Sequence, residues 1–224
     1  MEKLVAGIHH FRSNYFAENQ SLFEQLATEE QSPETLFITC SDARVVPNLI
    51  TSAAPGELFI VRNVGNIVPA ISRGMIGGVA AAIEYAVEAL NVENIVICGH
   101  TQCGAIDAIL DPSRVKHLGF VSRWLRESEV IPHLLRDKYA HLIGEARTVA
   151  AAEENVLVQL ENLRSYPFVS ERLEAGTLKV AGWVFKIATA QVFAYDPKVE
   201  QFVPFVRVAA PPSCAMLGAS APRR

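Results

Sequence analysis

The chain has 224 residues, enough for one globular domain with a sizeable hydrophobic core. Half of the residues are hydrophobic and 20% are charged, which excludes the composition of an intrinsically disordered chain. A net charge of −4 gives no support to nucleic-acid binding, and no run reaches the ~18 apolar residues that a membrane helix needs.

The first 31 residues form an amphipathic arm. Apolar residues recur at helical spacing, as at Leu4, Ile8 and Phe11, and Ser32-Pro33 ends the pattern. Charges and histidines interrupt every apolar run near the start, so the arm lacks the hydrophobic region of a secretory signal. The four cysteines are too sparse for a disulfide scaffold. We therefore expect a helical arm over residues 1–31 and a cytoplasmic location.

Short apolar runs bounded by turn residues predict buried strands farther along the chain. They cover residues 35–39, 58–61, 94–98, 178–185 and 191–195, with the last two joined as a hairpin. Helical patterns occupy residues 74–90 and most of 104–174, where 144–163 is the clearest helix and Pro167 closes that stretch.

Strands that alternate with helices predict an α/β fold. We expect a mostly parallel central sheet of four to five strands flanked by helices, with the arm at residues 1–31 attached to it. Residues 209–224, rich in proline and alanine, predict a disordered tail. Residues 1–208 therefore form a single predicted domain.

Two of the predicted strands end in residues that can bind a metal. Cys40 ends the first strand, and His100 follows the third, with Cys103 three residues later. Ligands of α/β folds gather at the carboxyl ends of strands, so the fold brings the three together. Two thiolates and one imidazole suit Zn²⁺, and three protein ligands leave a catalytic position open. Spacing alone leaves an alternative, because a cysteine at the end of a strand can be a buried core residue that binds no metal. We interpret Cys98 and Cys214 as cysteines of this second kind.

Two charged residues follow Cys40 in the sequence. Asp42 and Arg44 can face the same side of a turn and form a charge-assisted pair. One interpretation is an ordinary salt bridge across a turn. In the functional interpretation, Asp42 accepts a hydrogen bond from a zinc-bound hydroxide, and Arg44 keeps Asp42 ionised and off the metal.

These residues lie in motifs that resemble the β-class carbonic anhydrases, notably their cyanobacterial branch. In the family's order, the matching segments are CSDARVVP (40–47), PGELFIVRNVGN (55–66), AAIEYAV (81–87), ICGHTQCGA (97–105) and LKVAGWVF (178–185). The resemblance implies zinc on Cys40, His100 and Cys103, with an Asp42–Arg44 pair beside it. The implied reaction is the reversible hydration of carbon dioxide to bicarbonate and a proton by a zinc-bound hydroxide.

The resemblance also implies a substrate pocket and an assembly. An apolar pocket for carbon dioxide is expected at Val64 and Gly104 of one subunit, with Phe59 and Tyr85 contributed across a dimer interface. The family dimerises through exchanged amino-terminal helices, which would explain the apolar face of the arm. We therefore expect a homodimer or a tetramer of dimers.

The chain departs from the family pattern where some members carry a regulatory bicarbonate pocket. It has Phe37-Ile38-Thr39 in place of their Trp-x-Gly, and Phe185 in place of a tyrosine. We therefore expect an open site, in which water and not Asp42 is the fourth zinc ligand. Two alternatives remain: a zinc-binding relative without catalysis, and a hydrolase of carbon disulfide or carbonyl sulfide.

Overall fold

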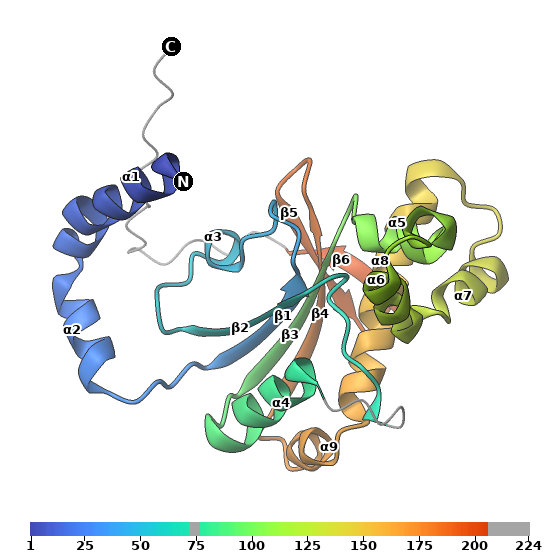
Figure 1. Cartoon of the computed structure of the whole chain (residues 1–224). Coiled ribbons are helices and arrows are strands. Elements are labelled where there is room, and N and C mark those ends of the chain that lie inside the picture. Colours follow the sequence, from blue (N-terminus) through green and yellow to red (C-terminus); the bar gives the residue numbers. More distant parts are fainter. Residues whose placement is uncertain (72–76, 206–224) are drawn as a thin grey trace.

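A six-stranded sheet forms the centre of the computed structural model, which describes residues 1–71 and 77–205 (Figure 1). The strands, in their order across the sheet, are β2 (Leu58–Asn63), β1 (Thr35–Cys40), β3 (Asn94–His100), β4 (Lys179–Lys186), β5 (Gln191–Asp196) and β6 (Gln201–Pro204). The first four are parallel, and β5 and β6 continue antiparallel. The predicted α/β fold, its mostly parallel sheet and the β4–β5 hairpin are confirmed.

The sheet has one strand more than the four to five expected from the sequence. The additional strand, β6, has four residues and pairs with β5 at the edge of the sheet. Its last residue, Pro204, has no N–H to donate, which only an edge strand tolerates readily. A short run that ends in proline gives a weak strand signal, and this explains why it was missed.

Helices α4 (Gly78–Glu84), α8 (Gly144–Arg164) and α9 (Pro167–Glu174) cover one face of the sheet (Figure 1). The π-helical turn η3 (Tyr85–Ala89) continues α4. The main core lies beneath them and includes the buried side chains of Leu36, Ile38, Ile95, Ile97, Val156, Leu160 and Leu163. Helix α8 packs closely on β4 at Gly182, where a Cβ would come within 2.8 Å of the Val156 side chain. The long helix is thereby fixed against the centre of the sheet.

A second group of short helices stands beside the carboxyl ends of the parallel strands (Figure 1). It comprises α5 (Gly104–Leu110), η4 (Pro112–Val115), α6 (Gly119–Trp124), η5 (Leu125–Ser128) and α7 (Ile131–Lys138). Their apolar side chains form a separate core with α8 that also includes Cys40 and Cys103. The prediction that residues 104–174 are mostly helical is confirmed. Pro167 does more than close α8, since it also begins α9, where its missing N–H needs no partner.

The opposite face of the sheet has a thinner cover. Its helix is α3 (Pro47–Thr51), a five-residue element that the apolar pattern did not predict. Ile50 of α3 packs over Phe37 and other side chains of this face. Trp183 packs edge-on against both Phe37 and Phe205.

The amino-terminal arm consists of α1 (Glu2–Phe11), η1 (Arg12–Phe16) and α2 (Gln20–Thr28) and projects from the sheet (Figure 1). Its predicted helices are present, but their apolar face is uncovered: Leu4 is 65% exposed and Ile8 66%. Within residues 1–71 and 77–205, no helix is long and apolar enough to cross a membrane. The predicted tail at 209–224 and the first part of the predicted helix at 74–90 lie outside the described residues.

Candidate metal centre

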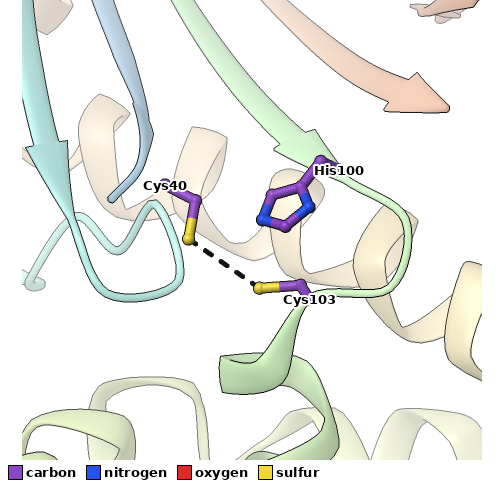
Figure 2. Close-up of side chains that lie close together, drawn as sticks. All are labelled: Cys40, His100 and Cys103. Atoms are coloured by element: carbon purple, nitrogen blue, oxygen red, sulfur yellow. Dashed lines mark hydrogen bonds between the residues drawn. The ribbon is translucent and has the colours of Figure 1, made fainter. Parts of the chain in front are cut away.

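Cys40 and His100 are the last residues of the neighbouring parallel strands β1 and β3. The chain places β2 on one side of β1 and β3 on the other, so the sheet reverses its order here. Ligands of α/β folds bind outside the strand ends at such a reversal. Cys103 lies on the loop that leads into α5, and the three buried side chains converge, with ligand atoms within 4.8 Å of one another (Figure 2).

The spacing of these atoms fits zinc. The two sulfur atoms are 3.9 Å apart, and two thiolates at about 2.3 Å from a tetrahedral zinc would be separated by roughly 3.8 Å. His100 Nδ1 lies 2.9 Å from the carbonyl oxygen of Thr101, to which it can only donate. This leaves a lone pair on Nε2, which is buried and has no hydrogen-bond partner among the described residues. An unpaired nitrogen beside two sulfurs is the donor set that a cation requires.

The three described cysteines differ in acidity. A hydrogen bond from Cys103 lowers the pKa of Cys40 to about 4, and the same contact with burial raises the pKa of Cys103. The contact therefore favours the thiolate form of Cys40, and a metal bound by both sulfurs would displace the proton of Cys103. Cys98 is different, because burial raises its pKa to about 12. The interpretation of Cys98 as a core residue agrees with this, whereas Cys214 lies outside the described residues.

A tight loop between β3 and α5 turns His100 and Cys103 toward the same point. Gln102 adopts a left-handed backbone conformation, with φ of 57°. The Thr101 N–H donates to the carbonyl oxygen of Phe185 at 3.0 Å, which anchors the loop to β4. The Gln102 carbonyl in turn accepts a hydrogen bond of 3.0 Å from Arg44. The loop is thus connected to the turn that follows Cys40.

Asp42 and Arg44 form a closely bonded pair at the rim of this centre. Asp42 Oδ1 accepts from the Arg44 backbone N–H and from its Nε, each at 2.9 Å. Oδ2 accepts from Arg44 Nη2 at 2.8 Å and lies 3.9 Å from His100 Nε2. The hydrogen bonds from Arg44 hold the pKa of Asp42 well below its usual range. A carboxylate oxygen accepts about two hydrogen bonds, so Oδ2 retains capacity for one more beside Cys40, His100 and Cys103.

Arg62 supports the same turn, and sequence reasoning missed it. Its Nε donates to the carbonyl oxygen of Cys40 at 3.2 Å, and its Nη2 donates to that of Asp42 at 2.7 Å. These bonds fix the backbone on both sides of Ser41. The available signal was an arginine near the end of the apolar strand β2, where a charge needs a partner.

The four predicted pocket residues fall into two places. Val64 and Gly104 flank the centre, since Gly104 follows Cys103 and Val64 precedes a residue that contacts Cys40. Phe59 and Tyr85 pack on each other, with ring centroids 5.9 Å apart. Phe59 is opposite Leu36, four residues before the end of β1, or roughly 13 Å along the strand. Within one chain, Phe59 and Tyr85 therefore stand apart from Cys40, His100 and Cys103, and their role across an interface stays a prediction.

Comparisons with known proteins agree with this geometry. A family model described as carbonic anhydrase matches residues 35–192. A carbonic anhydrase of the cyanobacterium Synechocystis sp. is 43% identical over 204 residues, which are 91% of this chain and 74% of that protein. The solved structure of the β-carbonic anhydrase CcaA, also 43% identical, superposes with a TM-score of 0.88 over 91% of this chain and 98% of its own. A structure from a study of two tetrameric β-carbonic anhydrases of Sordaria macrospora is 28% identical, with a TM-score of 0.77 and coverage of 86% and 95%.

Proposed function

This chain belongs to the β-class carbonic anhydrases, and we propose that it catalyses the reversible hydration of carbon dioxide to bicarbonate and a proton at the centre formed by Cys40, His100 and Cys103. One observation carries the assignment to this centre. Three buried ligand atoms converge beside a carboxylate oxygen that still has room for one hydrogen bond. A purely structural metal site has four protein ligands and needs no such neighbour.

Cys40, His100 and Cys103 would hold Zn²⁺ and leave its fourth position open. Zinc, when bound, supplies hydroxide at neutral pH by making water more acidic, a role for which carbonic anhydrases are themselves the standard example. Burial of the three side chains keeps competing water away from the ligand atoms.

Asp42 orients the attacking oxygen in this proposal. Its lowered pKa keeps the carboxyl ionised near neutral pH, so Oδ2 accepts a hydrogen bond and has no proton to donate. A hydroxide that donates its hydrogen to Oδ2 keeps its lone pairs free for the carbon of carbon dioxide. Arg44, with three hydrogen bonds to the carboxylate, holds Asp42 in this place and away from the metal position.

The proposal is tested by stopped-flow measurement of carbon dioxide hydration, with zinc quantified on the same sample. We expect about one zinc per chain and a hydration rate that rises in proportion to the zinc-loaded protein. Zinc near one per chain without hydration above buffer would contradict the proposal and indicate a non-catalytic relative. Turnover of carbon disulfide or carbonyl sulfide without hydration would indicate the analogue hydrolase instead.

We further propose that the active form is a homodimer or a tetramer of dimers. Two features support this: the arm exposes apolar residues such as Leu4 and Ile8, and Phe59 and Tyr85 stand apart from the metal ligands of their own chain. Tetramers are also described among the similar structures.

Sedimentation velocity is expected to give two or four times the mass of one chain, and Ile8→Asp is expected to lower that mass. A single-chain mass for the unaltered protein would contradict this assembly. The cytoplasmic location stays a prediction.

A further inference from the structure

The loop that follows β2 places a backbone N–H against a metal ligand. Gly65 donates from its backbone nitrogen to Cys40 Sγ at 3.4 Å. Gly65 has φ of +86°, a left-handed conformation that favours glycine, and a Cβ at this position would lie 3.1 Å from that of Ala105. The close approach of backbone to sulfur therefore depends on the conformation of this one residue.

Each of the two peptide units that meet at Gly65 is held by a side chain. Trp124 donates from its indole Nε1 to the carbonyl oxygen of Val64 at 2.7 Å. The Val64 carbonyl and the Gly65 N–H belong to the same planar peptide unit and point in opposite directions. The indole of Trp124 and Cys40 Sγ therefore hold this unit at its two opposite edges. Asn155 donates from Nδ2 to the carbonyl oxygen of Gly65 at 3.0 Å, which holds the next unit.

The orientation of the Asn155 amide is determined by its neighbours. The Val68 N–H, which can only donate, bonds Gln159 Oε1 at 2.8 Å. Gln159 Nε2 therefore faces the other way, where it donates to Ser128 Oγ and to Asn155 Oδ1 at 3.0 Å each. With Oδ1 occupied in this way, Asn155 has only Nδ2 to offer Gly65. Ser128, Asn155 and Gln159 are all fully buried, so water cannot replace these bonds.

We propose that Trp124 and Asn155 are positioning residues that hold the Gly65 N–H on the sulfur of Cys40. A hydrogen bond donated to a thiolate stabilises its charge and fixes the direction of its lone pairs, so it preorganises the sulfur for a metal. The inference rests on the proposed function, because it needs Cys40 as a ligand. It concerns two residues that hydrogen-bond the peptide units on either side of Gly65 and whose effect on Cys40 is transmitted through that backbone.

Trp124→Phe tests the inference, because it removes the indole N–H and keeps an aromatic ring. We expect the zinc Kd, measured by chelator competition, to rise about tenfold, as is typical when a hydrogen bond that supports a metal ligand is lost. In the cobalt-substituted protein, the thiolate-to-cobalt charge-transfer band is expected to move to longer wavelength, because the sulfur loses a hydrogen bond. Asn155→Asp, which keeps the shape but removes the Nδ2 donor, is expected to shift both readouts in the same direction.

Trp183→Phe is the matched control. Trp183 lies on the opposite face of the sheet against Phe37 and Phe205, so the same substitution there is expected to change neither the zinc Kd nor the cobalt band. Folded Trp124→Phe and Asn155→Asp proteins with the wild-type Kd and band would overturn the inference, and either variant decides alone if the other does not fold. A wild-type chain that binds no zinc would overturn the proposed metal site itself, a result distinct from unaltered variants of a zinc-binding protein.

Discussion

Cys103→Ser is expected to abolish stable zinc binding and, with it, the hydration of carbon dioxide. A serine hydroxyl stays protonated at neutral pH, and zinc favours thiolate, imidazole and carboxylate ligands. The substitution would leave Cys40 and His100 as the two remaining members of the group. Removing a direct ligand is expected to cost more than the 10- to 100-fold loss of affinity typical of residues around the ligands. Zinc content after dialysis and the hydration rate measure the two effects.

Cys98→Ser is the control for this prediction, because it makes the same chemical change two residues before His100 on the same strand. Cys98 is fully buried on the face of the sheet that α3 covers. Its sulfur donates to the carbonyl oxygen of Gly99, and a serine hydroxyl can make the same hydrogen bond. We expect Cys98→Ser to retain its zinc. If Cys103→Ser kept zinc near one per chain, the assignment of Cys103 as a ligand would be wrong.

The convergence of the metal group could be predicted from the sequence because it depends on a general property of parallel sheets. Cys40 and His100 each end a buried strand, and neighbouring parallel strands end at the same edge. Short apolar runs were sufficient to locate those strands. The Asp42–Arg44 pair was predictable for a similar reason, since its partners are two positions apart in one turn.

Contacts between distant residues could not be predicted in this way. Trp124 and Val64 are 60 positions apart, and Asn155 and Gly65 are 90 apart. Their contacts depend on how α6 and α8 pack against the loop after β2, which no local pattern encodes. The edge strand β6 and the helix α3 were missed because elements of four and five residues carry too little periodicity.

Asp42→Asn is expected to reduce kcat/KM about 100-fold, within the range for a residue that handles the reacting proton, while zinc is retained. The carboxylate accepts three hydrogen bonds from Arg44, on both of its oxygens. An amide has one oxygen, so one of its sides must present an NH₂ group. If the NH₂ group takes the place of Oδ1, it opposes the backbone N–H and Nε of Arg44. If it takes the place of Oδ2, it opposes Nη2 and also replaces the acceptor that the attacking oxygen needs. Steady-state hydration kinetics on zinc-matched samples measure the loss.

Asp107→Asn is the matched control, because it neutralises another aspartate paired with an arginine. Asp107 Oδ2 lies 3.1 Å from Arg114 Nη1 on the surface of α5. Surface ion pairs contribute little to the stability of the fold, so we expect Asp107→Asn to keep its activity within about twofold of the wild type. Wild-type kcat/KM for Asp42→Asn would remove the role assigned to Asp42. Loss of zinc from Asp42→Asn would contradict the open site instead, since a carboxylate held by Arg44 and away from the metal is not needed to bind it. Retained zinc with lost turnover is the result that the orienting role of Asp42 predicts.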